Sequence, residues 1–166
     1  DPSVTPSTVT FTVTAPASSS SSFSSSSSSS SSTLALTLQK IMKVGGVEQY
    51  TVDRGQNLSF ELTITNPNAF PVNTVNVQDA WTADVLDSVD GDNGCTWSGS
   101  PSQELTCDNL TIPANDFVTI HVTATAKTDA TLGDADNTVS VTSINGNPPD
   151  PSVTPSTVTF TVTAPA

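Results

Sequence analysis

Basic residues are scarce in this chain of 166 residues. Lys and Arg together number 4 against 16 Asp and Glu, so the formal net charge is -12 at pH 7. Recognition of phosphate groups depends on Lys and Arg, and this composition therefore argues against nucleic acid or an anionic membrane surface as a partner. The chain also lacks the run of about 20 apolar residues that a membrane-spanning helix needs, so we expect no membrane span.

Side chains that carry catalysis are equally rare. His121 is the only histidine, and it points away from the apolar face that Val118, Ile120 and Val122 predict. No Ser or Cys stands in a recognisable nucleophile elbow, and no Gly-rich phosphate loop is present. We therefore expect neither enzymatic activity nor a cofactor.

Cysteine occurs only twice, as Cys95 and Cys107, on either side of a predicted turn at residues 99–102. Two short strands, 95–98 and 104–108, would form a hairpin around this turn. The pair is either two free buried thiols or a disulfide, and we favour the disulfide because exported chains oxidise nearby cysteines. Abundant Thr, Ser, Asn, Asp, Val and Pro, with little Lys, Arg or Glu, favour an extracellular or cell-surface all-β module.

A stretch of 17 residues occurs twice without a change. Residues 1–17 read DPSVTPSTVTFTVTAPA, and residues 150–166 repeat them letter for letter. A fixed internal period is typical of repeat arrays, so we interpret the chain as a window cut from a longer tandem protein. Val9, Phe11 and Val13 alternate with threonine, which predicts a strand with one apolar face. Residues 1–17 would then belong to, or complement, a neighbouring identical repeat, and the expected partners are copies of the chain itself.

A serine tract follows, and two further sites are candidates for sugars. Residues 18–32 are serine except for Phe23, so residues 18–33 have no apolar face and are predicted to be a linker outside the domain. Asn57 and Asn109 each begin an N-glycosylation sequon. The expected covalent glycans would also use serine hydroxyls, and these candidates are Ser18, Ser19, Ser20, Ser21, Ser22, Ser24, Ser25, Ser26, Ser27, Ser28, Ser29, Ser30, Ser31 and Ser32.

Residues 34–166 alternate apolar and polar residues with period two, and no stretch has a convincing helical period. Turn signals separate these segments at intervals typical of an all-β domain. We therefore predict an immunoglobulin-like (Ig-like) Greek-key β-sandwich of seven to nine strands. The nine candidate strands are residues 34–39, 47–52, 58–64, 75–79, 95–98, 104–108, 118–124, 137–141 and 157–163.

The pattern resembles a known family over nearly all of residues 34–166. Residues 54–79, RGQNLSFELTITNPNAFPVNTVNVQD, look like the first half of the conserved-repeat surface domain that is common in prokaryotic exported proteins. Residues 110–126, 137–143 and 149–163 match its later strands. Arg54 stands where that family usually has proline, and residues 66–68 replace its Gly turn. The resemblance implies an Ig-like sandwich that occurs in tandem on cell surfaces, with no enzymatic activity.

An acidic loop at residues 87–94 contains Asp87, Asp90, Asp92 and Asn93. Clustered side-chain oxygens are the ligands that calcium prefers, but the full EF-hand pattern and its closing Glu are absent. We interpret these residues as solvated turn acids and expect no metal. The same interpretation applies to Asp129, Asp134 and Asp136.

Strand parity places three polar residues on faces that should be buried. Lys40 continues the inward set of the first strand, Asp79 that of the third, and Asn137 that of the penultimate strand. A bulge could turn Lys40 outward, or Lys40 and Asp79 could form an ion pair at the rim. The third hypothesis is an isopeptide bond between Lys40 and Asn137, assisted by Asp79, because a buried amine loses its proton readily. This order of Lys, acid and Asn resembles the self-crosslinking Ig-like domains of surface adhesins and pili.

Two functions therefore remain open. The first is a structural repeat of an extracellular filament or surface stalk, which the perfect repeat and the serine tract favour. The alternative is an adhesin module that binds glycan or protein ligands through its loops. An exposed aromatic platform formed by Trp81 and Trp97 would support the alternative.

Overall fold

A computed structural model describes residues 34–100 and 102–166. The predictions for Val9, Phe11 and Val13 and for the serine linker lie outside the described residues. Among those that are described, no helix has the length and hydrophobicity needed to cross a membrane.

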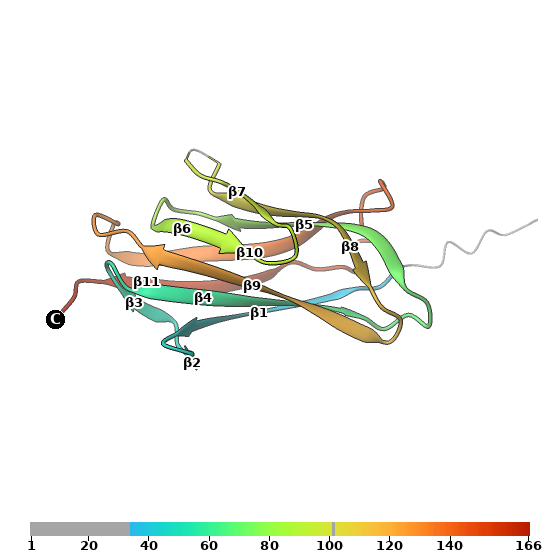
Figure 1. Ribbon diagram of the computed structural model, residues 1–166, viewed down its shortest axis with the longest axis horizontal. Helices are drawn as coiled ribbons and strands as arrows, with labels where there is room; N and C mark the ends of the chain where they lie inside the picture. Colours follow the sequence, from blue (N-terminus) through green and yellow to red (C-terminus); the bar gives the residue numbers. More distant parts are fainter. Residues whose placement is uncertain (1–33, 101) are drawn as a thin grey trace, which may run out of the picture. The chain divides into compact units, whose positions relative to one another are not determined.

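The described chain folds into two packed β-sheets (Figure 1). One sheet has the order β2-β1-β4-β9-β6 and the other the order β3-β11-β10-β5-β8-β7. The predicted all-β sandwich is thereby confirmed. The strands are β1 (Thr37–Val44), β2 (Val47–Glu48), β3 (Thr51–Asp53), β4 (Asn57–Asn66), β5 (Val72–Trp81), β6 (Leu86–Gly91), β7 (Thr96–Ser98), β8 (Glu104–Ile112), β9 (Asp116–Ala126), β10 (Gly133–Ile144) and β11 (Ser156–Thr163).

The described residues form more strands than the seven to nine predicted, for two reasons. The segment at 47–52 divides into β2 and β3, which pair with strands of different sheets. The predicted acidic loop is partly wrong, because its first half forms β6 and pairs with β9. The register of that pair shifts between Asp87 and Asp90, so the period-two pattern that identifies a strand is interrupted there.

The first strand, β1, begins later than residue 34, keeps the predicted parity and ends just before the expected break at residues 45–46. Leu36, Met42 and Val44 are all buried in the core. The strand ends at Gly45, where the backbone takes positive φ that glycine adopts at little cost. The parity argument for the first strand is therefore sound, and only its predicted start is wrong.

The core lies between the sheets and is centred on aromatic rings. The ring of Phe60, on β4, packs edge to face against Trp81 on β5 and Phe160 on β11, with centroids 6.0 and 5.9 Å apart. All three side chains are buried. Such pairs add to the burial of apolar area, so this cluster joins the two sheets at the centre of the sandwich.

The last strand, β11, occupies an interior position of its sheet. It pairs antiparallel with β10 along seven residues and parallel with β3. Val158, Phe160 and Val162 point into the core with exposed fractions of 5, 1 and 1%. The second copy of the repeated sequence therefore supplies a central strand of the domain.

Candidate functional site

The three polar residues on inward faces come together in the core. Lys40 is 5% exposed and lies on β1, in the first sheet. Asp79 and Asn137 are both fully buried and lie on β5 and β10, which are neighbours in the second sheet. The pairing of β1 with β4 runs without a register shift past Lys40, so the bulge alternative is wrong. Lys40 and Asp79 do form the ion pair of the second alternative, but it lies in the core and not at the rim.

One carboxylate oxygen connects the cluster. Lys40 Nζ donates to Asp79 Oδ1. Asn137 Nδ2 donates to the same oxygen at 2.8 Å and to the carbonyl of Ala80 at 3.1 Å. The lysine amine and the asparagine carboxamide therefore share an acceptor atom, although they come from opposite sheets.

Aromatic rings enclose the lysine amine. Lys40 Nζ lies 4.8 Å from the ring centroid of Phe60 and 5.5 Å from that of Trp81. These faces attract a cation, and they also keep water away from the amine. The amine is therefore in contact with one carboxylate and two rings in a dry part of the core.

Burial moves both ionisable groups toward their neutral forms. Desolvation lowers the pKa of Lys40 to about 8, although the charge and hydrogen bond of Asp79 oppose the shift. Desolvation likewise raises the pKa of Asp79, against the opposing effects of Lys40 and of the Asn137 hydrogen bond. Both shifts lower the free energy needed to move a proton from the amine to the carboxylate.

The cluster is poorly satisfied as a set of hydrogen bonds. Asp79 Oδ2 and Asn137 Oδ1 are buried and have no partner among the described residues. An unpaired buried polar atom costs about 1–3 kcal/mol, and a buried ion pair seldom stabilises a fold more than apolar side chains of the same volume. Core stability alone therefore does not explain these three residues.

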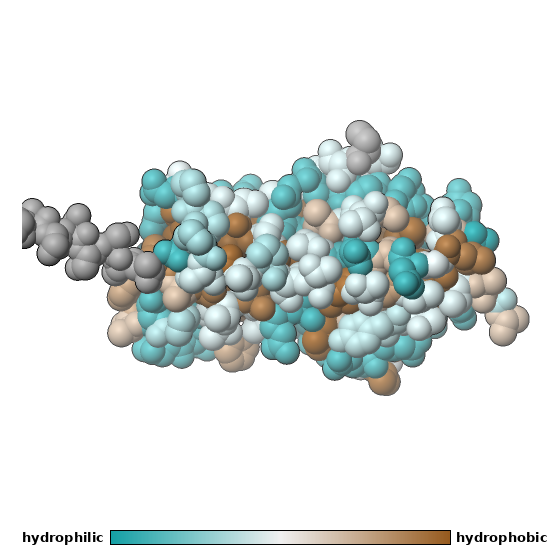
Figure 2. Space-filling model, turned by 180° about the vertical axis from the view of Figure 1, so that it is seen from behind, coloured by the Kyte–Doolittle hydropathy of each residue, from teal (hydrophilic) through white to brown (hydrophobic). Residues whose placement is uncertain are grey.

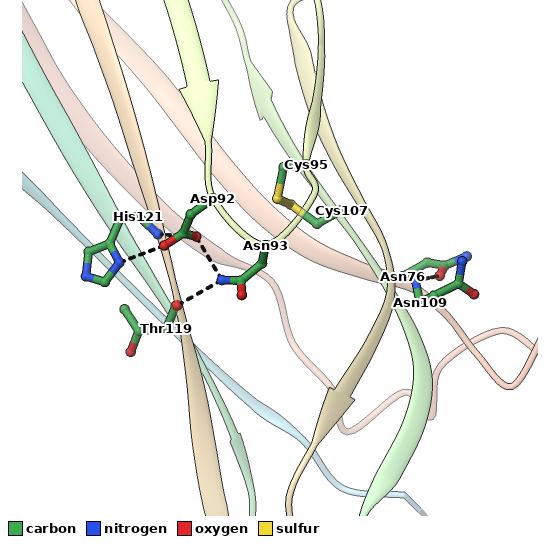
Figure 3. Close-up of a disulfide and its surroundings, with 8 residues drawn as sticks. All are labelled: Asn76, Asp92, Asn93, Cys95, Cys107, Asn109, Thr119 and His121. Atoms are coloured by element: carbon green, nitrogen blue, oxygen red, sulfur yellow. Dashed lines mark hydrogen bonds and ion pairs between the residues drawn. A yellow bond between two sulfur atoms is a disulfide. The ribbon is translucent and has the colours of Figure 1, made fainter.

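The predicted disulfide is present on the second sheet. Cys95 and Cys107 are joined next to the hairpin of β7 and β8 (Figure 3). A Cβ on Gly91 would come within 3.0 Å of the Cys95 Cβ and 2.8 Å of Leu105, so the bridge also closes tightly over the end of β6. The hairpin itself is confirmed by the pairing of Thr96–Ser98 with β8.

Removal of this bridge is expected to destabilise the domain. A Cys95→Ala/Cys107→Ala variant should lose about 3 kcal/mol of unfolding free energy, because the unfolded chain gains the entropy of the opened loop. Urea denaturation with and without a reductant measures the loss. The reductant should lower the midpoint of the parent and leave that of the double variant unchanged, and equal midpoints for both proteins under oxidising conditions would contradict the prediction.

The turn acids are engaged with neighbouring side chains and backbone. Both oxygens of Asp92 contact His121, Oδ1 accepting from its backbone N–H at 2.9 Å and Oδ2 lying 3.0 Å from Nδ1 (Figure 3). Asp134 and Asp136 accept hydrogen bonds from threonines of β11. Within 34–100 and 102–166, no three His, Cys, Asp or Glu side chains form a group suited to a metal ion.

Both sequon asparagines are on the surface. Asn57 begins β4 and its Oδ1 accepts from Thr125 Oγ1 at 2.8 Å. Asn109 is exposed on β8, and its backbone N–H donates to Asn76 Oδ1 at 2.9 Å (Figure 3). Their accessibility is what an acceptor requires, and glycosylation of either residue stays a prediction.

The aromatic platform that would favour adhesion is not formed. Trp81 is 5% exposed, and Trp97 packs edge to face against it with ring centroids 5.1 Å apart. Trp97 itself is partly buried against the core. Both indoles thus serve packing, and the adhesin hypothesis loses the feature that would have distinguished it.

Sequence reasoning located the polar cluster but missed the rings around it. Trp81 follows Asp79 by two positions and therefore shares its inward face, a signal that was available. Phe60 lies on β4, and nothing local in the sequence indicates that its ring covers Lys40. That contact depends on how strands of the two sheets face each other.

Solved structures with a similar fold support the Ig-like sandwich. The CARDB domain of a Pyrococcus furiosus protein, crystallised in complex with di-metal ions, has a TM-score of 0.52 and 13% identity over 80% of this chain and 90% of that one. BslA, described as a bacterial hydrophobin, has a TM-score of 0.50 and 11% identity over 80% and 98%.

At such low identities, similarity shows the fold alone. No family model and no curated protein sequence matches the chain. The Ig-like sandwich implied by the conserved-repeat resemblance is confirmed, whereas membership of that repeat family stays a prediction.

Proposed function

We propose that this chain is a structural repeat unit of an extracellular filament or cell-surface stalk. Neighbouring units would be joined by tandem repetition and by strand complementation. One observation carries the proposal: residues 1–17 have the same sequence as residues 150–166, the segment that contains β11. Identical strands fit identical positions, so residues 8–14 would fill the β11 position in a neighbouring sandwich.

The burial of β11 explains why its position demands a strand of this sequence. Val158, Phe160 and Val162 fill the core, and the backbone of β11 pairs with strands on both sides. A sandwich without β11 would expose this apolar surface together with two unpaired strand edges, which favours capture of a matching strand. Val9, Phe11 and Val13 provide the matching apolar face in the first copy.

Two features of the domain fit an extracellular location. The disulfide is typical of proteins from oxidising compartments, and the face in Figure 2 is mainly hydrophilic, with apolar side chains in separate spots. Sugars on Asn57, Asn109 and the serine tract would coat such an assembly. Intact mass of the protein from its natural source tests this part, and an unmodified mass would refute it.

Complementation predicts how a truncated chain assembles. A chain of residues 1–149 has a donor strand and lacks β11. We therefore expect it to form folded multimers in which residues 8–14 of each molecule occupy the β11 position of the next. Size-exclusion chromatography with light scattering measures the mass of the particles. A chain of residues 34–166, which has β11 and no donor, should be monomeric.

A single substitution serves as the control for this experiment. Phe11→Asp places a charge on the apolar face of the donor and should abolish the multimers of the 1–149 chain, because a buried carboxylate without a partner is costly. Multimers that persist with Phe11→Asp, or a folded monomer of the 1–149 chain, would refute complementation between molecules.

A further inference from the structure

The buried cluster has the components of an acyl-transfer reaction. Lys40 supplies a primary amine, Asn137 a carboxamide, and Asp79 an acid–base group between them. A primary amine displaces ammonia from a carboxamide when it is neutral, close to the carbonyl carbon, and served by a group that protonates the leaving nitrogen.

Proximity follows from the shared acceptor. Lys40 Nζ and Asn137 Nδ2 both donate to Asp79 Oδ1, so the two nitrogens are separated by at most about two hydrogen-bond lengths, roughly 6 Å. Lys40 is held by the pairing of β1 with β4, whereas Asn137 has a paired strand on each side and donates to the carbonyl of Ala80. Little conformational freedom remains to be lost before the amine meets the carboxamide.

The surroundings favour neutral reactants. Phe60 and Trp81 cover the amine, and Lys40, Asp79 and Asn137 are all buried. The contact between Lys40 and Asp79 allows the ammonium to pass a proton to the carboxylate, which gives an amine with a free electron pair. Water that could hydrolyse the carboxamide is excluded from the same space.

We infer that Lys40 Nζ and Asn137 Cγ join in an intramolecular amide bond, with Asp79 moving the protons. The ammonium first gives one proton to Asp79 Oδ1, and the amine attacks Asn137 Cγ to form the C–N bond. The protonated Asp79 delivers its proton to Nδ2 and takes another from the attacking nitrogen. The bond between Cγ and Nδ2 then breaks and ammonia leaves, so the products are a secondary amide, neutral Asp79 and ammonia.

The product removes the electrostatic cost of the cluster. Before reaction the core contains an ammonium and a carboxylate, and afterwards it contains an amide and a neutral acid. The new bond connects β1 of one sheet with β10 of the other. The two halves of the sandwich thereby become covalently joined through their interior, a property that does not depend on how the chain assembles.

The test is the intact mass of purified chain 1–166. We expect a mass about 17 Da below that of the sequence with its disulfide, which is the mass of one ammonia lost in the substitution. Fragmentation of a digest should yield one branched peptide that contains Lys40 and Asn137. A full-length mass without the loss would overturn the proposal, as would a loss of water with Lys40 joined to Asp79.

Four variants locate the reaction. Lys40→Met, Asn137→Ala and Asp79→Asn should each retain the full mass calculated for their sequence. Lys43→Met is the matched control, because Lys43 lies on the same strand and forms a partly exposed pair with Glu61, and this variant should still lose ammonia. Circular dichroism reports whether each variant folds, and a folded Asp79→Asn protein that still forms the bond would overturn the role of Asp79.

Discussion

A Phe160→Ala substitution is expected to lower the free energy of unfolding by about 3–5 kcal/mol. Phe160 is 1% exposed, and its ring packs against Phe60 at a centroid distance of 5.9 Å. Truncation leaves a cavity in the middle of the buried face of β11, and the pairing of Phe160 with Ala135 of β10 limits collapse. Urea denaturation of the monomeric chain measures the change.

The repeated sequence provides an internal control for this experiment. Phe11 occupies the same place in the first copy, so Phe11→Ala is the same chemical change in the same local sequence. If the first copy belongs to a neighbouring unit, this substitution should change the unfolding free energy of the monomer by no more than about 0.5 kcal/mol. If Phe11→Ala lowered the unfolding free energy strongly and Phe160→Ala only slightly, the first copy would occupy the β11 position of its own domain.

The Lys40→Met variant is expected to lose about 3–5 kcal/mol of stability at pH 7, because it leaves the Asp79 carboxylate buried without a cation. Burial already raises the pKa of Asp79 above its ordinary value, and removal of Lys40 abolishes two of the effects that oppose this rise. A carboxyl group with a raised pKa in the folded state stabilises the fold fully below its unfolded pKa. That stability is lost as the pH rises through the folded pKa.

The melting temperature of Lys40→Met should therefore be closer to that of the parent at pH 4 than at pH 7. A Lys40→Met/Asp79→Leu double variant is the control, because it has no carboxylate at this position. The difference between single and double variants should shrink as the pH falls from 7 to 4. A difference that stays constant over this range would contradict the assignment of the effect to Asp79.

Strand faces could be predicted from the sequence because a β-strand has a strict period of two. That argument alone places Lys40, Asp79 and Asn137 on inward faces, and the structure buries all three. The strand β6 could not be predicted in this way. Its buried residues Leu86 and Val89 are three positions apart, because the pairing with β9 has an irregular register.

Contacts between strands that are far apart in the sequence cannot be predicted from local sequence patterns. Nothing in the sequence near Thr51–Asp53 indicates a parallel pairing with β11, because such a pairing depends on the path of the whole chain. For the same reason the shared oxygen of Asp79 and the ring of Phe60 over Lys40 could not be foreseen. Parity gives the side of a strand on which a residue lies, and sandwich packing decides which residue it meets there.

The interior position of β11 has a consequence for biosynthesis. Ribosomes make the chain from its N-terminus, so β3 and β10 are complete while the place between them is still vacant. The sandwich cannot close until residue 163 has been made, and during this interval the earlier copy at residues 1–17 is already present. Protease protection of nascent chains, arrested with β11 either inside or beyond the ribosomal exit tunnel, would measure when closure occurs. The two identical strands would therefore compete for the β11 position, and the order of their synthesis would decide which of them binds there.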